Sequence, residues 1–488
     1  MIVISFLLFA IEVACVNSAN ILGIIPTASF SHQVPFHPLW REFDEGKGFL
    51  DIADTLARMM NEANEAQLSS PEIQNLIHNE SLHFDLLMVE AQLPGMMAFS
   101  WRFKCPMIGI ASLDASKHYH TVLGNPNHPV INPDVNLPVN DPEELTFKER
   151  ISAFLYGIIY EYVFMYGKVY PGTHMQFKQY FGEDLPSFDD LLQNISMLFV
   201  NTNPIFQNVR ALHPNTVAIG GTLHLKAPEP LPRELQEYLD NSTNGLIYFS
   251  LGGNVQGYLI ADIFKDILAA FSELPYNFLI KSDLEMDDLP SNVRIGTWFP
   301  QQDIFRHPNV KLFISQGGLQ SLQESVINGI PVIGIPFFGD QFSNVHKMMK
   351  KGYGIKLEKT KISKESMKSA ILQIMNDSKY RETAKELSEI LKDEEMSGLQ
   401  KAVWWTEYVL RHKGASHWRS PTVGMPFWKF YLLDVICFIG FLTCVLPFCQ
   451  LQSTKTSVKE TKHIYFNFNR NLPIENYKIA KYIIFVNK

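Results

Sequence analysis

Glycine and polar residues that could hold a phosphate directly follow a short apolar run in the second half of the chain. The run, residues 311–315, is typical of a buried strand. Gln316, Gly317 and Gly318 stand between it and a helical pattern that begins at Leu319. At such a junction the first backbone N–H groups of the helix are free, and the helix dipole attracts negative charge. Because glycine lets the backbone approach a ligand closely, we expect a phosphate group at this turn.

Further polar and aromatic side chains stand at set distances around this turn. Glu324 lies two turns into the predicted helix, where its carboxylate can accept hydrogen bonds from two ribose hydroxyls. A second apolar strand, 331–336, leads to Asp340 and Gln341, and Trp298 offers a flat surface for a base. Together these groups indicate a site for a nucleotide diphosphate that carries a sugar. The alternative is an ordinary strand–helix unit whose two glycines only allow tight packing.

This continuous stretch resembles the signature of the UDP-glycosyltransferase family, in particular its insect-type UDP-glucuronosyl and UDP-glucosyl members. They are membrane-bound enzymes that move a sugar from a UDP-sugar to a small lipophilic acceptor. The resemblance implies that Trp298 stacks on uracil, Gln301 contacts the uridine and Glu324 binds the ribose. It also implies that Asp340 and Gln341 hold sugar hydroxyls. The residues expected to bind the UDP-sugar are Gly253, Trp298, Gln301, Gln316, Gly317, Gly318, Gln320, Glu324, Asp340 and Gln341.

Two of these positions depart from the family's pattern. The family usually has a histidine where this chain has Gln316, and that histidine donates to the diphosphate. Glutamine can still donate through its amide, but it cannot carry a positive charge. The family usually has a serine at the position of Gly253, so a hydroxyl donor is lost there. Both departures favour an alternative function, a relative that binds UDP-sugar or lipophilic ligands without turnover.

His32 is the candidate catalytic base. It follows the predicted strand 21–26, at the strand end where open α/β sheets bind ligands, and histidine can accept a proton near neutral pH. From the residue alone, a loop histidine with local hydrogen bonds is the alternative. The run ILGIIPTASFSHQ resembles the start of the family's enzymes, which implies that His32 deprotonates the acceptor hydroxyl.

Glu90 is the second candidate catalytic residue. It ends the apolar run 84–89, where the family usually places an aspartate that orients the base. The alternative is a surface acid at a strand end. The separation from His32 to Glu90 is about half of that in the family, so we expect the first domain to lack one or more strand–helix units. A parallel sheet cannot lose an interior strand without repairing the gap.

The chain of 488 residues is too long for a single core. Apolar strands alternate with helical patterns, which predicts an α/β protein with parallel, doubly wound sheets. With the family resemblance this implies the GT-B architecture, two Rossmann-like doubly wound domains, plus one C-terminal transmembrane helix. The expected limits are an acceptor-binding domain at 20–227, shortened as described, a linker at 228–244 with three prolines, and a UDP-sugar-binding domain at 245–417.

The two ends of the chain carry apolar segments. Residues 1–19 read as a signal peptide, and a retained first strand is the alternative. Residues 428–451 are long and apolar enough to predict a transmembrane helix, with a buried soluble helix as the alternative. Lysines in the tail, 452–488, are consistent with a cytosolic side. Together with the family resemblance, these segments imply a single-pass type I protein of the endoplasmic reticulum membrane with its catalytic part in the lumen.

Composition excludes other classes of function. The net charge is −8 and no basic stripe is present, so we expect no nucleic acid partner. The five cysteines form neither a disulfide scaffold nor a metal-binding pattern. The resemblance implies a UDP-sugar as co-substrate and no metal or other cofactor, and a homo-oligomer is possible.

Together these features predict an inverting glycosyltransferase that moves a hexose to a hydroxyl of a small lipophilic acceptor, as in detoxification. UDP-glucose is the expected donor, because the resemblance is to insect-type members, and UDP-glucuronic acid is the alternative. The acceptor cannot be read from the chain.

Overall fold

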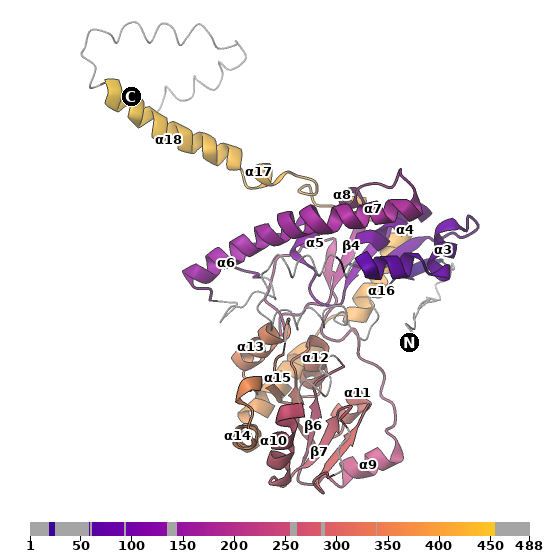
Figure 1. The fold of residues 1–488 in the computed structure, drawn as a ribbon, viewed down its shortest axis with the longest axis vertical. Coiled ribbons are helices and arrows are strands. Elements are labelled where there is room, and N and C mark those ends of the chain that lie inside the picture. Colours follow the sequence, from indigo (N-terminus) through magenta and orange to yellow (C-terminus); the bar gives the residue numbers. More distant parts are fainter. Residues whose placement is uncertain are drawn as a thin grey trace. The chain divides into compact units, whose positions relative to one another are not determined.

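The computed structural model describes residues 19–24, 58, 61–91, 94–133, 144–253, 261–284, 288–337 and 339–453. The chain divides into two compact units, Met1–Val423 and Gly424–Lys488. The first unit holds two parallel sheets (Figure 1). Two parallel α/β sheets in one chain form the two-domain GT-B architecture that the sequence predicts. All but the last residue of the predicted signal peptide and nearly all of the predicted tail lie outside the described residues.

The first sheet has five parallel strands in the order in which they occur along the chain. They are β1 Ile21–Ile24, β2 Leu86–Glu90, β3 Met107–Ala111, β4 Ile195–Val200 and β5 Thr216–Ala218. Each is a short apolar run, as expected for strands that are covered on both faces.

The doubly wound prediction does not describe this first sheet. A doubly wound sheet starts near its middle and reverses direction, whereas the described strands run consecutively from β1 to β5. The physical reason lies in the short separation between β1 and β2, which pair directly, with Ile24 opposite Val89. Among the described strands, β1 is therefore an edge strand, and the sheet has no interior gap to repair.

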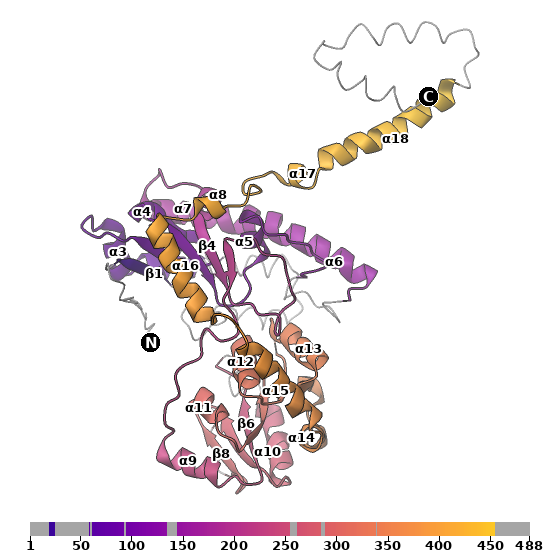
Figure 2. The same ribbon diagram turned by 180° about the vertical axis from the view of Figure 1, so that it is seen from behind.

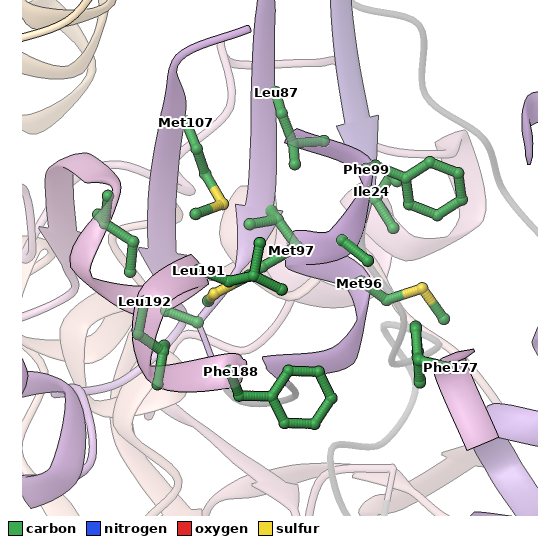
Figure 3. Close-up of a cluster of buried hydrophobic side chains, with 14 of the residues drawn as sticks. Ile24, Leu87, Met96, Met97, Phe99, Met107, Phe177, Phe188, Leu191 and Leu192 are labelled. Atoms are coloured by element: carbon green, nitrogen blue, oxygen red, sulfur yellow. The ribbon is translucent and has the colours of Figure 1, made fainter. Parts of the chain in front are cut away.

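Consecutive strands joined by right-handed crossovers place the intervening helices on one face of a sheet. The helices of this part are α3 Pro71–His78, η2 Pro94–Met97, α4 Ala98–Phe103, α5 Lys117–Val122, α6 Phe147–Ile158, the π-helical η3 Ile159–Val169, α7 Tyr170–Phe181 and α8 Phe188–Gln193. Figure 3 shows the buried cluster in which Met97 and Phe99 of this layer meet Leu87 and Met107 of the strands.

The opposite face of the first sheet is covered by a helix from the far end of the chain. This helix, α16 Gly398–His412, lies along the sheet (Figure 2), and its Val409 packs with Leu86 and Phe199 of the strands. The short η6, Ser416–Trp418, follows it. The domain predicted at 245–417 thus ends in a helix that belongs to the core of the first sheet.

The second sheet has six parallel strands in the order β11-β10-β9-β6-β7-β8. They are β6 Leu246–Ser250, β7 Asn277–Lys281, β8 Val293–Gly296, β9 Val310–Ser315, β10 Val332–Gly334 and β11 Gly354–Lys356. The chain enters at β6 in the middle and reverses between β8 and β9, so this sheet is doubly wound as predicted. The switch of direction between β6 and β9 is where such sheets bind ligands.

Helices flank this second sheet and build its two apolar cores. They are α9 Arg233–Asp240, α10 Ala261–Ser272, α11 Gln301–Phe305, α12 Leu319–Ile327, α13 Gln341–Lys351, η5 Lys359–Lys361, α14 Lys364–Asn376 and α15 Lys379–Lys392. Helix α9 falls within the predicted linker, yet Leu235 and Leu239 are buried with Tyr248 of the second domain. The linker therefore contains a packed helix.

Buried hydrogen bonds join the parts of the first unit. Gln323 of α12 donates to the side-chain oxygen of Asn201, directly after β4, at 3.2 Å. Asn203 donates to Glu394, which lies between α15 and α16, at 3.0 Å. The bond from Gln323 is fully buried, and because a buried polar group without its partner destabilises the fold, it holds the carboxyl end of β4 against α12.

The second unit contains α17 Phe427–Phe430 and α18 Leu433–Ser453, which overlap the segment 428–451. Its apolar side chains from Trp428 to Phe441 are exposed. Over the part of the chain that the structure describes, no helix is both long and apolar enough to cross a membrane.

Candidate active site

Two glycine turns lie side by side at the switch point of the second sheet. Strands β6 and β9 are neighbours, with Ser250 opposite Ser315, and each serine hydroxyl accepts a hydrogen bond from the glycine N–H two residues on. Gly252 and Gly317 have φ values of 75° and 89°, which favour glycine. A Cβ atom on Gly252 would overlap the amide nitrogen of Gln316, so the two turns touch.

A third loop reaches the same turns from β10. Asn344 of α13 donates one hydrogen bond to the carbonyl oxygen of Gly317 at 3.0 Å and another to Oδ2 of Asp340 at 2.7 Å. The structure thus attaches Asp340 to the second glycine turn, as the spacing predicts. Gln341 accepts a hydrogen bond from the backbone of Phe337 at 2.8 Å, so its side chain holds this loop. Asn344 was not predicted, although it lies one helical turn after Asp340.

Glu324 is nearly buried, with 8% of its surface exposed, and its two oxygens are held by two amides. Gln301 donates to Oε2 at 2.6 Å, and Gln302 donates to Oε1 at 2.9 Å. Gln301 also lies 3.2 Å from the hydroxyl of Ser321. The amino end of α11 therefore orients the carboxylate that the sequence assigns to the ribose. Gln302 was not predicted, although it is adjacent to Gln301.

The remaining predicted donor-site residues lie on the turns and on the loop before α11. Gln316 is buried at the end of β9, and Gly318 precedes the first turn of α12. Trp298 lies between β8 and α11 with 68% of its surface exposed, which leaves the ring accessible. Gln320 and Gly253 are also exposed.

Of the two predicted catalytic residues, His32 lies outside the described residues. Glu90 is the last residue of β2, and only 5% of its surface is exposed, so the interpretation of a surface acid is wrong. The neighbouring strand β1 ends at Ile24, opposite Val89. The described end of β1 therefore lies beside the end of β2 that carries Glu90.

A buried ionic cluster lies at the carboxyl edge of the first sheet. His120 of α5 lies 2.9 Å from Oδ1 of Asp114, and Arg210 donates to Oδ2 at 2.8 Å. Burial raises the pKa of Asp114, but the hydrogen bond from His120 and the charges of His120 and Arg210 outweigh it, so this pKa lies below its ordinary value. The cluster joins the loop after β3 to the loop after β4.

Replacing Asp114 by asparagine is expected to lower the free energy of unfolding by about 3 kcal/mol at pH 7, because the buried Arg210 loses its carboxylate. Since folding lowers the pKa of Asp114, this stabilisation is complete above the ordinary carboxyl pKa, about 4, and is lost as pH falls through the lowered value. The free energies of unfolding of the two proteins, measured by denaturant titration, should therefore differ fully above about pH 4 and converge as the pH falls through the lowered pKa of Asp114. Asp240→Asn, at the exposed partner of His307, is the control and should have a far smaller effect. A difference that grows towards low pH would contradict the assigned charge state.

Comparison with known proteins identifies the family. The family model described as UDP-glucoronosyl and UDP-glucosyl transferase matches residues 44–467. UDP-glucosyltransferase 2 of Dactylopius coccus is 35% identical over 377 residues, which cover 76% of this chain and 71% of that protein. UDP-glycosyltransferase UGT5 of the same insect is 35% identical over 90% of this chain and 81% of its own. UDP-glucuronosyltransferase 2B1 of Rattus norvegicus is 30% identical over 402 residues, which cover 78% of this chain and 74% of that protein.

Solved structures were compared as well. The glycotransferase of kitacinnamycin gives a TM-score of 0.49 at 14% identity and covers 73% of this chain and 82% of its own. The calicheamicin glycosyltransferase CalG4 gives a TM-score of 0.48 at 17% identity, and the match covers 76% of this chain and 84% of that protein. The family model spans most of the sequence, and the insect relatives align over most of their own length. On these grounds the chain belongs to the UDP-glucuronosyl and UDP-glucosyl transferase family and is a UDP-sugar glycosyltransferase.

Proposed function

We propose that the protein transfers glucose from UDP-glucose to a hydroxyl group of a small lipophilic acceptor, with inversion at the anomeric carbon, as in detoxification. The observation that carries the proposal is the pair of adjacent glycine turns after β6 and β9, with Glu324 and Asp340 held around them. The first backbone N–H groups of α12, which have no partner within the helix, suit a diphosphate, and the carboxylates suit ribose and sugar hydroxyls.

In the proposed mechanism His32 takes the proton of the acceptor hydroxyl, and the oxygen attacks the anomeric carbon as the bond to UDP breaks. One displacement inverts that carbon. Glu90 orients the base from the end of β2, which its burial beside the β1 end supports. The charge that develops on the departing UDP is stabilised by the first backbone N–H groups of α12 and by the dipole of this helix.

The donor sugar is tested directly. Purified protein is incubated with either UDP-glucose or UDP-glucuronic acid and a panel of phenols and steroid alcohols, and the glycosides are identified by mass spectrometry. The name of the insect UDP-glucosyltransferase supports glucose, and that of the rat relative supports the alternative. We expect a glucoside as the main product. If the main product is a glucuronide, the donor is UDP-glucuronic acid and the proposed UDP-glucose is wrong.

We also propose that the catalytic part lies in the lumen of the endoplasmic reticulum and is attached to the membrane through residues 428–451. The exposed apolar side chains of this segment support it. In sealed microsomes, protease is expected to trim only the tail, 452–488, and to reach the region of Trp298 only after detergent is added. Digestion of that region in intact vesicles would reject a luminal catalytic part.

A second candidate function, binding without turnover, is favoured by Gln316. Its side chain is buried between the two glycine turns, where a histidine could carry a positive charge beside the diphosphate. The two functions differ in a single measurement, since only an active enzyme forms glycoside from bound UDP-sugar.

Replacing Gln316 by histidine is expected to tighten UDP-glucose binding or to raise turnover at acidic to neutral pH, because charge-assisted hydrogen bonds are roughly twice as strong as neutral ones. A histidine loses its charge above about pH 6.5, so the benefit should shrink as pH rises. Calorimetry and initial rates from pH 5.5 to pH 8 measure it, with Gln316→Asn as the uncharged control. If binding and turnover do not change over this range, Gln316 does not impair the enzyme.

A further inference from the structure

The connection between the two sheets runs along the donor-binding helix α11 before it reaches α9. Gln302 of α11 donates to the carbonyl oxygen of His224 at 3.2 Å and accepts a hydrogen bond from the backbone N–H of Lys226 at 2.8 Å. Further along, the backbone N–H of Glu229 donates to Asp303 at 3.0 Å. The segment 224–229, here called the connector, is thus bound by its backbone to the helix that orients Glu324.

His224 places its imidazole ring against the same carboxylate. Its Nε2 lies 3.4 Å from Oε1 of Glu324, and only 20% of its side chain is exposed. Both ring nitrogens are buried, and neither has a hydrogen-bond partner among the described residues. A buried polar group left in this state costs stability, so packing alone does not account for a histidine at this position.

A carboxylate offers about four lone-pair sites, and the amides of Gln301 and Gln302 occupy two of them. The two hydroxyls of a ribose fit the remaining two only if the carboxylate is held in one orientation. Gln301 and Gln302 fix it from α11. His224 approaches Oε1 from the connector, on the same oxygen as Gln302. An imidazole ring this close to Oε1 opposes rotation of the carboxylate when the ribose binds.

We propose that His224 is a positioning residue for nucleotide recognition: it holds the Glu324 carboxylate in the orientation that accepts both ribose hydroxyls. The connector between the two sheets then takes part in selecting a ribonucleotide. This inference rests on the proposed role of Glu324 in binding the ribose of the donor.

The experiment compares UDP with 2′,3′-dideoxy-UDP, which keeps the base and the diphosphate but lacks both hydroxyls. Dissociation constants are measured by calorimetry for the full chain and its variants. The wild type should prefer UDP. His224→Ala should reduce this preference by about fivefold, the loss expected for one hydrogen bond, because UDP binds more weakly while dideoxy-UDP binds as before.

Three further variants test the assignment. His224→Gln places an amide nitrogen near the position of Nε2 and should restore most of the preference. Lys226→Ala keeps the backbone N–H that Gln302 accepts from and should change neither constant. In a Glu324→Ala background, His224→Ala should have no further effect on the preference, since the carboxylate that it positions is gone.

Each remaining outcome has a defined meaning. A full preference in His224→Ala overturns the inference, and so does an equal loss for both nucleotides, which indicates packing alone. If His224→Ala fails to fold, His224→Gln decides. A folded His224→Gln protein that no longer prefers UDP over dideoxy-UDP overturns the inference. A wild type that does not bind UDP overturns the proposed function itself, and a wild type that binds both nucleotides equally removes Glu324 from the ribose.

Discussion

Replacing His32 by alanine is expected to lower kcat by about 10²–10⁴-fold, the usual contribution of a general base. Without it the acceptor must attack as a neutral hydroxyl, which is a weak nucleophile. The dissociation constant of UDP should stay the same, because the turns that are proposed to bind it belong to the second sheet. Initial rates of glucoside formation at saturating substrate, together with calorimetry for UDP, measure the two quantities separately.

A histidine elsewhere in the first domain supplies the control. His83 lies on the surface before β2, with 73% of its side chain exposed, and His83→Ala should leave kcat unchanged. If His32→Ala retains kcat within about threefold, a factor far below that of general base catalysis, another group takes the acceptor proton. A matching loss of UDP affinity would instead indicate damage beyond the acceptor site.

The strands of the second domain could be predicted because buried parallel strands read as apolar runs. The run 311–315 forms β9, Val310–Ser315, and the run 331–336 contains β10, Val332–Gly334. The order of strands could not be read in the same way, since it depends on which distant segments pair. For the first sheet, the short separation of His32 and Glu90 predicts the loss of strand–helix units, but it does not predict that β1 and β2 pair directly.

Helix α9 was read as part of a linker for a local reason. Three prolines precede it, and only Leu235 and Leu239 of its eight residues are buried. So short an apolar pattern is weak beside a proline-rich segment. The packing of helix α16 on the first sheet could not be predicted either, because it depends on contacts with strands far away in the chain.

The candidate site shows the same division between local and distant signals. Glu324 and Asp340 could be placed near the glycine turns because short, regular elements separate them from Gly317. His224 is a hundred residues before Glu324, and no periodicity connects the two. The burial of Glu90 could not be predicted either, because it depends on which distant segments of the chain cover the end of β2.

Replacing Glu324 by alanine is expected to weaken UDP binding by about 5- to 150-fold, which corresponds to the 1–3 kcal/mol lost when buried polar groups lose their partner. The change removes the acceptor for the ribose hydroxyls and also leaves the amides of Gln301 and Gln302 without the oxygens that they hold. Calorimetric titration with UDP measures the effect. Glu324→Gln keeps the shape and one acceptor oxygen, so it should fall between the wild type and alanine.

Two comparisons separate binding from folding in this experiment. Glu229→Ala removes an exposed carboxylate from the connector while its backbone contact to Asp303 remains, and it should leave UDP affinity unaltered. Thermal unfolding of Glu324→Ala without nucleotide shows how much of the loss comes from the unpaired amides alone. An unchanged dissociation constant in a folded Glu324→Ala protein would show that Glu324 does not bind the ribose.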